Sequence, residues 1–589
     1  MNFYIKILII CSLTNFIKCD LGPDKFDGTV VDLPNLGRLK GRLGKTYFTK
    51  RDISLFYGIN YARPPSGTRR FLPPEPFGPW TGTYDATMMR QRCPQVDMDY
   101  YPSPDPGMIN EKKDKEDCLV VNVFSPNVTD KAKLPVMVYL HGGSFIAGSA
   151  YDFQPDFLLE KDIVLVVPQY RLGVLGFLCL ELDDLPGNMA MMDIHLALKW
   201  VKQNILYFGG DPSKITVVGQ SAGAAAASSL LISPLVKRDL FNQMIIQSGS
   251  VLGPWVIEEK PIASARIIAE KVKCPIYSIR DMANCLKMKP AHMLMEAQYQ
   301  AMSSDLAIGK LNTVGRGLVV QNWGLTRFLT KHPVEEFTTG PRIAVPIMGG
   351  VTRDEGSVFF TSFYDKLKNI RVRDGYLQRN VTRDILESQG IDDPYGTLTD
   401  LYHNMLFKAG ENQTLEDMLP GFVDLFGTIM LKQSTYHVLR SMSNSRPAYA
   451  YAFNFYGNIS KVRASSPDWN KKYPFPSGVA HSDELGYLFP TKQSNYTERE
   501  LNMVKELTKY WTNFVIYGSP NGKDVAVWPS MSTPFGPYLR FTNDQEVHEN
   551  FNVEYEMNAK EGFLYGSAST ISVCITALMT FAMTLLLFF

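Results

Sequence analysis

Five short, nearly continuous apolar runs constrain the fold of this chain more than any other feature of its sequence. They are LPVMVYLHGG, DIVLVVPQYRLG, SKITVVGQSAG, FNQMIIQSGS and RIAVPIMGGVTRDEG. Each run is too short for a buried helix and suits a strand that is covered on both faces. Between the second and third runs, residues 189–201 carry apolar side chains at helical spacing, followed by Gly209 and Gly210. The order strand, helix, strand predicts a parallel sheet in an α/β fold.

Residues 22–550 contain no low-complexity linker and no internal repeat that would divide them. We therefore predict one large domain with long loop insertions. Residues 285–335 are expected to form helices and pocket-lining loops. Hydrophobic residues make up 45% of the chain, enough for a sizeable core, and the 60 basic and 59 acidic residues nearly cancel. This balance argues against a nucleic-acid partner and leaves the substrate class open.

Both ends of the chain carry targeting patterns. Residues 1–19 combine an early lysine, an apolar run and a small residue near Cys19, which is typical of a cleaved secretion signal. A buried N-terminal helix is the alternative. Residues 567–589 are uncharged, with small residues first and aliphatic residues after them, which favours a glycosylphosphatidylinositol (GPI) anchor signal over a transmembrane helix. Residues 551–566 would then form a stalk, and the candidate cleavage positions are Asn558, Gly562, Gly566 and Ser567.

Of the 8 cysteines, Cys11, Cys19 and Cys574 lie in the terminal segments, so the remaining five cannot all pair within the chain. Cys179 lies in the apolar stretch LGVLGFLCLEL and is expected to be a buried free thiol. In an oxidising compartment, the candidate bridges join the near neighbours Cys93 with Cys118 and Cys274 with Cys285, each worth about 3 kcal/mol by loop entropy. Glycosylation sequons, which suit an exported protein, occur at Asn127, Asn380, Asn412, Asn458 and Asn495.

The stretch ITVVGQSAGAAAASS places Ser221 between two glycines, after a predicted strand and before an alanine-rich helix. This is the context of a nucleophile elbow, a turn so tight that side chains at Gly219 and Gly223 would strike neighbouring backbone. The alanines let the helix approach the sheet closely. A serine that only caps the helix is the alternative, because the GxSxG pattern also occurs by chance.

A serine nucleophile needs a histidine base and a carboxylate that orients the base, and in elbow enzymes the chain order is serine, acid, histidine. His481 is the strongest candidate base, because SGVAHSDELGYLF places it in a loop between a strand-like run and a helical segment. For the acid, the residues alone admit either Asp354 or Glu355. The other histidines after the elbow lie in polar or helical sequence: His332, His403, His437 and His548.

An oxyanion hole needs backbone N–H groups aimed at the developing negative charge, each worth about 3 to 4 kcal/mol. One donor is expected to be Ala222, directly after the nucleophile, and the others lie in a glycine-rich turn after an earlier strand. The turn in VYLHGGSFIAG, with Gly142, Gly143 and Ser144, fits that description. An ordinary Gly-Gly turn would explain this segment alone, but not its pairing with the elbow.

These motifs closely resemble those of the type-B carboxylesterase and cholinesterase family of α/β-hydrolases, from TVVDLPNLGRLKG to WPSM. EDCLVVNVFSP at residues 116–126 and FGGDPSKITVVGQSAGAAAASSLLISP are similar to two signatures of that family. GQSAG together with GVAHSDE is also similar to insect juvenile hormone esterases and related arthropod esterases, although Ile194 replaces a glutamine usual in that subgroup. The resemblance implies an α/β-hydrolase fold, with a large, mostly parallel sheet, helices on both faces and long loop insertions.

The same resemblance assigns roles to individual residues. It implies a catalytic triad of Ser221 as nucleophile, Glu355 as acid and His481 as base. It places the oxyanion donors at Gly143, Ser144 and Ala222, and the family's early disulfides at Cys93 with Cys118 and Cys274 with Cys285.

Three positions of the expected substrate pocket depart from the cholinesterases that the chain resembles. Those enzymes carry a tryptophan in place of Met108, a glutamate in place of Gln220 and an aromatic residue in place of Val358. Each lost aromatic face removes roughly 1 to 2 kcal/mol of binding to a quaternary ammonium. The departures favour a neutral, apolar ester over a choline ester. Trp255 and the tyrosines at 100–101 are the aromatic residues that would have to compensate in a cholinesterase.

The leading hypothesis is therefore an exported serine carboxylesterase, anchored at the extracellular face of the cell membrane, that acts through an acyl-enzyme without metal or cofactor. Its expected partners are a small-molecule ester and the membrane. A homodimer is a further possibility, for which no motif argues. One alternative is a cholinesterase-like hydrolase. The other is a neuroligin-like adhesion protein with a retained triad; members of that branch have generally lost triad residues, which this chain keeps.

Overall fold

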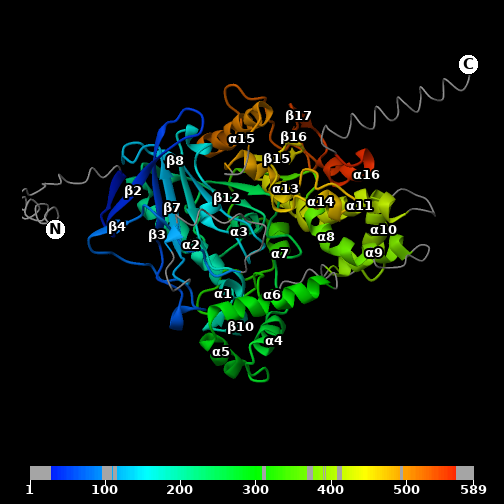
Figure 1. The fold of residues 1–589 in the computed structure, drawn as a ribbon, viewed down its shortest axis with the longest axis horizontal. Coiled ribbons are helices and arrows are strands. Elements are labelled where there is room, and N and C mark those ends of the chain that lie inside the picture. The colour runs from blue at the N-terminus through cyan, green and yellow to red at the C-terminus, as the bar shows by residue number, and fades with distance from the viewer. Residues whose placement is uncertain are drawn as a thin grey trace, which may run out of the picture.

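The centre of the protein is a sheet of 13 strands (Figure 1). The structure is a computed structural model and describes residues 28–95, 109–110, 116–307, 314–367, 376–388, 391, 393–406, 414–490 and 495–564. Twelve strands follow one another across the sheet in the order β1-β2-β3-β7-β9-β8-β12-β13-β14-β15-β16-β17, and β4 pairs with β2. Their bounds are β1 (Gly28–Leu33), β2 (Gly37–Lys45), β3 (Asp52–Asn60), β4 (Thr83–Asp85), β7 (Val120–Ser125), β8 (Leu134–Leu140), β9 (Val164–Pro168), β12 (Gly210–Gln220), β13 (Gln243–Gln247), β14 (Ile347–Thr352), β15 (Ala448–Phe453), β16 (Tyr538–Phe541) and β17 (Gln545–His548).

The five apolar runs of the sequence form neighbouring strands, as predicted. They pair in the order β9-β8-β12-β13-β14, and each of these pairs is parallel. β15 and β16 continue the parallel block. The edges of the sheet differ, because β1, β2, β3 and β7 pair antiparallel on one side and β17 on the other. Continuous apolar runs do not reveal such edges, since a strand such as β2 buries only some of its residues.

Helices cover the sheet and extend beyond it. Those that the text uses are α1 (Gly173–Phe177), α2 (Met189–Asn204), α3 (Ala222–Ser229), α4 (Pro261–Lys271), α5 (Ile279–Met288), α6 (Ala291–Ala307), α7 (Pro333–Thr339), α8 (Gly356–Leu367), α9 (Tyr376–Ser388), α10 (Thr397–Leu406), α11 (Leu415–Gly427), α12 (Gln433–Ser443), α15 (Glu498–Tyr517) and α16 (Met557–Glu561). Figure 1 shows α4, α5 and α6 at one end of the molecule and α8 to α11 at another. The helices expected within residues 285–335 are thus α6 and the ends of α5 and α7.

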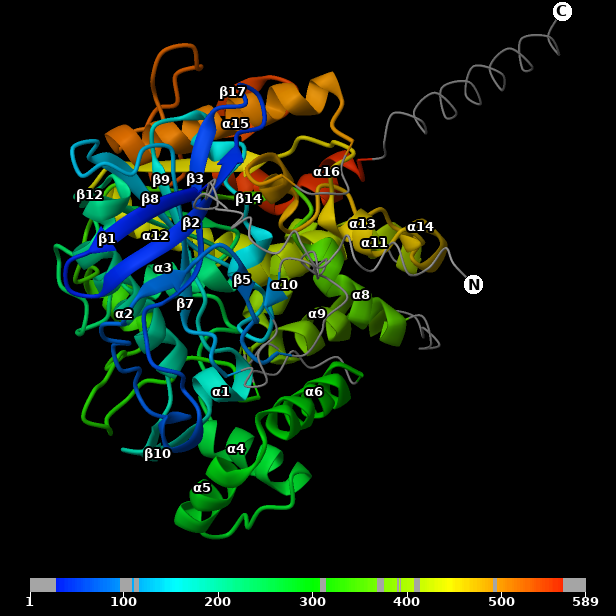
Figure 2. The ribbon, with the colours of Figure 1, turned by 60° about the vertical axis from the view of Figure 1, so that its left-hand side comes forward.

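The two faces of the sheet bury different side chains of each central strand. In β8, Val136, Val138 and Leu140 belong to one core cluster, whereas Met137 and Tyr139 belong to another. Side chains of α2, α3 and α12 complete the first cluster, and those of α15 complete the second. Figure 2 shows α15 on one side of the sheet and α2, α3 and α12 on the other. The predicted arrangement, a mostly parallel sheet with helices on both faces, is confirmed.

The C-terminal part of the described chain packs onto the same domain. Phe551 and Glu554 are fully buried, Asn558 is 1% exposed, and the carbonyl of Gly562 accepts a hydrogen bond of 2.8 Å from Arg353. From the sequence, residues 551–566 were expected to form a stalk. As far as Leu564, the last residue described, this segment instead belongs to the folded domain, because buried contacts hold it there.

The structure contains both disulfides that were expected. Cys93 is bonded to Cys118, and Cys274 to Cys285. Cys179 is a buried free thiol, and burial raises its pKa to about 12, so it stays protonated at neutral pH.

Candidate active site

Ser221 lies in a sharp turn between β12 and α3. β12 ends at Gln220 and α3 begins at Ala222, so a single residue joins the strand to the helix. Ser221 has φ 58° and ψ −124°, a conformation that costs a residue with a Cβ about 1 to 3 kcal/mol. Its backbone N–H donates to the carbonyl of Gln247 at 2.8 Å, which ties the turn to β13. The strand, turn and helix of the predicted elbow are therefore present.

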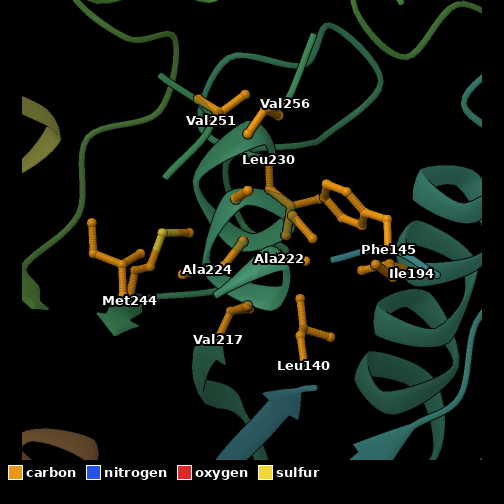
Figure 3. Packing of buried hydrophobic residues seen from close by; sticks show 14 of the residues in the cluster. Leu140, Phe145, Ile194, Val217, Ala222, Ala224, Leu230, Met244, Val251 and Val256 are labelled. Atoms are coloured by element: carbon orange, nitrogen blue, oxygen red, sulfur yellow. The ribbon is translucent and has the colours of Figure 1, made fainter. Parts of the chain in front are cut away.

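Two glycines make this turn possible for the reason the sequence suggested. A Cβ at Gly219 would lie 2.1 Å from the carbonyl oxygen of Gly223, and one at Gly223 would lie 2.0 Å from that of Leu140. Both distances are far inside van der Waals contact, and the obstructing atoms are backbone. Figure 3 shows the alanine-bearing start of α3 packed closely against Val217 and Leu140 of the sheet.

The predicted oxyanion turn packs directly against the elbow. A Cβ at Gly142 would lie 2.7 Å from the carbonyl oxygen of Gln220 and 2.9 Å from the Cβ of Ser221. Gly143 and Ser144 both have positive φ, 115° and 53°. Within the described part of the chain, the N–H groups of Gly143, Ser144 and Ala222 donate no hydrogen bond. Three backbone donors beside the serine are thus free to bind an oxyanion.

The side chain of His141 forms a hydrogen bond with this turn. Its Nδ1 lies 2.9 Å from the carbonyl oxygen of Gly142, and its ring stacks on Tyr170 with centroids 4.4 Å apart. The Tyr170 hydroxyl donates to the His141 carbonyl at 2.6 Å. Burial lowers the pKa of His141 to about 4, so the ring is neutral at pH 7 and donates from Nδ1 to Gly142.

The candidate base, His481, approaches the elbow from residues 473–482, here called the base loop, which follow α14 (Trp469–Lys472) and precede the 3₁₀ helix Asp483–Tyr487. Its Nδ1 lies 2.6 Å from Oε2 of Glu355, and its Nε2 lies 3.3 Å from Nε2 of Gln220, the residue before Ser221. Because the carboxylate accepts from Nδ1–H, the neutral ring carries its lone pair on Nε2, as a general base requires. Among the described residues the Ser221 hydroxyl forms no hydrogen bond; in substrate-free enzymes such catalytic bonds are often long.

The structure separates the two candidate acids, Asp354 and Glu355. Glu355 is fully buried, contacts His481 with one oxygen and accepts from the N–H of Thr352 at 2.7 Å with the other. Asp354 holds the backbone of the base loop instead, since its Oδ2 accepts from the N–H of Val479 at 2.7 Å. Burial alone would raise the pKa of Glu355, but His481 and the hydrogen bonds hold it below its ordinary value. Glu355 is therefore an ionised partner for an imidazolium.

The expected pocket residues lie at different places. Gln220 is 1% exposed and points toward the base loop, and Trp255 is 6% exposed, donating from its indole N–H to the carbonyl of Met430 at 2.8 Å. The Trp255 ring lies 6.0 Å from that of Phe145, next to the oxyanion turn. Val358 is half-buried in α8, and Met108 lies outside the described residues. Trp255 thus lies near the oxyanion turn, and Gln220 lies beside His481.

Sequence reasoning missed several neighbours of the triad. The ring of Phe359 lies 5.5 Å from that of His481, and the Ser482 hydroxyl accepts a 2.7 Å hydrogen bond from Gln220. Glu484 is fully buried and accepts from Gln247 at 3.1 Å. Burial and the negative charge of Glu355 raise the pKa of Glu484 to about 8, which keeps it protonated at neutral pH. The available signal was proximity in the sequence: Ser482 and Glu484 lie one and three residues after His481, and Phe359 lies four residues after Glu355.

Leu252, Pro254 and Ile429 contribute to the lining of a cavity of about 670 Å³. None of its lining residues is a member of the triad or the oxyanion turn. In the described part of the chain, no cluster of three or more His, Cys, Asp or Glu side chains is arranged to hold a metal ion.

The family model of the carboxylesterases matches residues 27–559. The chain belongs to the carboxylesterase family. Its α/β-hydrolase fold also matches a crystal structure of juvenile hormone esterase from Manduca sexta with OTFP covalently attached. The TM-score is 0.74 and the identity 25%, with 89% of this chain and 96% of that chain covered. Family and fold together make the protein a carboxylic ester hydrolase.

Several relatives align with most of this chain. Juvenile hormone esterase of Tribolium castaneum is 31% identical over 532 residues, 86% of this chain and 87% of the relative. Esterase FE4 of Myzus persicae is 30% identical over 561 residues, covering 91% and 92%. Glutactin of Drosophila melanogaster is 30% identical over 531 residues, which are 88% of this chain but only 50% of glutactin. This carboxylesterase thus spans half of glutactin and nearly the whole length of the esterases.

Proposed function

We propose that this carboxylesterase hydrolyses neutral, apolar carboxylic esters through an acyl-enzyme formed on Ser221. The observation that carries the proposal is the 2.6 Å contact of His481 with Glu355, which sets the lone pair of Nε2 at the elbow. A bare turn with a capping serine would need neither a buried carboxylate nor a histidine from a segment 260 residues away in sequence (481 minus 221).

The chemistry follows from the positions of these groups. His481 Nε2 takes the proton of the Ser221 hydroxyl as the oxygen attacks the ester carbonyl, and Glu355 stabilises the resulting imidazolium. The N–H groups of Gly143, Ser144 and Ala222 receive the oxyanion. Collapse breaks the bond to the alcohol, which leaves with the proton from His481. Water then attacks the acyl-enzyme and gives its proton to His481, which passes it to the departing Ser221 oxygen as the acid is released.

The preference for a neutral substrate rests on charge. Among the described residues beside Ser221, Gln220 is an amide where the cholinesterases that the chain resembles carry a carboxylate. Val358 offers no aromatic face to a quaternary ammonium, and the indole of Trp255 is largely buried against Phe145. These replacements do not weaken the binding of an uncharged alcohol or acyl group. A choline ester, in contrast, loses the groups that would attract its quaternary ammonium.

The test is hydrolysis of p-nitrophenyl acetate, butyrate and octanoate by the secreted protein. We expect Ser221→Ala to lower kcat by at least about a thousandfold, because it removes the nucleophile. Ser229→Ala is the matched control, since Ser229 is buried in the same helix and donates to the carbonyl of Ala226. Equal inactivity of the wild type and Ser221→Ala would contradict the enzyme proposal and favour an adhesion protein. Efficient turnover of acetylthiocholine would contradict the neutral-ester proposal and favour a cholinesterase.

We further propose that the protein is exported and N-glycosylated. Asn127, Asn458 and Asn495 are exposed and Asn380 is half-buried, so glycans would meet no core at the exposed sites. Asn412 lies outside the described residues. The two disulfides suit the oxidising secretory pathway. Treatment with peptide N-glycosidase F should increase electrophoretic mobility, and replacing the three exposed asparagines with glutamine should abolish most of that shift.

We propose a GPI anchor for attachment to the extracellular face of the membrane. No helix in the described residues is long and apolar enough to cross a bilayer, and the tail at 567–589 lies outside them. Asn558 is buried and hydrogen-bonded to Asp354 and Asp424, so cleavage there would remove a folded contact. Gly566 and Ser567 are the better cleavage positions. Phosphatidylinositol-specific phospholipase C should release the enzyme from cells; retention would favour a transmembrane helix.

A further inference from the structure

Gln220 occupies an unusual position between the nucleophile and the base. It is the last residue of β12 and precedes Ser221, and its side chain is 1% exposed. Its Nε2 donates to the Ser482 hydroxyl at 2.7 Å and lies 3.3 Å from Nε2 of His481. One amide therefore contacts both the base and the residue that follows the base.

The Nε2 atom of His481 must accept a proton in one step and donate it in the next. The Gln220 amide suits both states, because its N–H can donate to the lone pair of a neutral ring until the Ser221 hydroxyl replaces it there, and its carbonyl can accept from an imidazolium after a half-turn of the amide. The hydroxyl of Ser482 can donate or accept, so it can pair with the amide in either orientation. A carboxylate at this position would pair with the charged ring alone.

We propose that Gln220 is a positioning residue for His481, which holds the base in both of its protonation states through an amide shared with Ser482. This inference rests on the proposed function. It assigns Gln220 to the proton-transfer machinery, whereas the sequence placed it in the substrate pocket. It also predicts a consequence for pH dependence, since a neutral amide, unlike a carboxylate, adds no charge beside the imidazole.

The other charged groups around the base lie on different sides. Glu355 faces Nδ1, and Phe359 flanks the ring. Asp354 and Asp483 accept from the N–H groups of Val479 and Ala480. Other charged or titratable groups near the loop include Glu484 and Lys461, which interact with Asp483, Arg353 and Lys432, which interact with Asp354, and Arg463, which donates to the Gly478 carbonyl. None of these contacts is made at Nε2, where Gln220 is the described partner.

The test compares Gln220→Glu and Gln220→Leu with the wild type, using a neutral p-nitrophenyl ester over pH 5 to 9. Gln220→Glu places a carboxylate within 4 Å of the imidazole, so the acid limb of kcat/KM should move upward by about one pH unit. Gln220→Leu removes both hydrogen bonds, and kcat should fall about tenfold to a hundredfold with little change in KM. Ser482→Ala should give a smaller loss, and the Gln220→Leu/Ser482→Ala double variant should lose less than the product of the two.

Gln243→Leu is the matched control, because Gln243 begins β13 at the opposite end of the strands from the site. It should leave the pH profile unchanged, and melting temperatures identify variants that fail to fold. An unmoved acid limb in folded Gln220→Glu, or a raised KM with unchanged kcat in Gln220→Leu, would overturn the proposal. Failure of the proposed function would look different, since the wild type itself would then show no hydrolysis.

Discussion

The elbow and the base loop are built in opposite ways. The elbow is one continuous segment, and its shape follows from the small residues Gly219, Gly223 and Ala222 within it. The base loop around His481 has no such local rule. It is held by Asp354 from the end of β14, by Gln220 from the elbow and by Arg463 from a neighbouring helix. Ser221 is thus positioned by local backbone geometry, and His481 by long-range hydrogen bonds.

This difference predicts that damage to the two regions will appear in different measurements. A change in the elbow should first affect folding, because the clash is with backbone that cannot move aside. A change around the base loop should first affect catalysis, because polar side chains can relax or admit water while the fold survives. Four variants test the comparison, in order of decreasing expected effect.

Gly223→Val tests the elbow. A Cβ at this position would lie 2.0 Å from the Leu140 carbonyl oxygen, at the junction of β8, β12 and α3. We expect little or no folded protein, measured as the yield of monodisperse enzyme on gel filtration. Gly340→Val is the control for losing a glycine, because a Cβ there meets no atom within 4 Å, although its φ of 101° carries strain. Normal folding of Gly223→Val would contradict the local account of the elbow.

Glu355→Gln tests the triad without removing volume. The amide can still contact His481, but it carries no charge to stabilise the imidazolium and can fix the wrong tautomer. We expect kcat to fall by about a thousandfold to ten-thousandfold. The melting temperature should change little, because the N–H of Thr352 keeps an acceptor. Activity close to that of the wild type would show that Glu355 is not the acid, and Asp354→Asn would then be examined for the larger loss.

Glu484→Gln is the matched contrast to Glu355→Gln, since both carboxyls are buried and near the base. The pKa of Glu484 is raised to about 8, so folding opposes its ionisation. Glutamate in the unfolded chain ionises near pH 4.5. The resulting loss of folding stability is therefore absent below that pH, grows as the pH rises toward 8 and then levels off. Glu484→Gln should therefore gain stability relative to the wild type between pH 5 and pH 8, on the order of 3 kcal/mol. Chemical unfolding at the two pH values measures it, and a constant difference would contradict a protonated Glu484.

Asn558→Ala tests the tie between the C-terminal segment and the base loop. The Asn558 amide donates to Asp354 at 2.7 Å and to Asp424 at 3.0 Å, and Asp354 in turn holds Val479. Losing these bonds leaves buried carboxylate oxygens short of partners, which should cost about 2 kcal/mol of unfolding free energy. We expect up to about a tenfold fall in kcat, because Asp354 orients the loop and not the reacting atoms. A loss of stability with unchanged kcat would limit this segment to a structural role.

The sequence by itself determined the parts of this protein that depend on short segments. Apolar runs located β8, β9, β12, β13 and β14, because a strand buried on both faces needs apolar residues throughout. GQSAG located the elbow, because a side chain at either of its glycines would clash with backbone a few residues away or in the neighbouring strand. The two disulfides also followed from cysteines that are near neighbours in the chain.

Only the tertiary structure decided which groups act together. Asp354 and Glu355 both carry a carboxyl group and are adjacent in sequence. Only the direction of each side chain shows that Glu355 contacts His481 and that Asp354 accepts from Val479. The positions of Gln220, Glu484 and Asn558 depend on contacts with segments far away in the chain. The physical reason is range: steric rules of the backbone act over a few residues, whereas hydrogen bonds and buried charges depend on where distant segments meet.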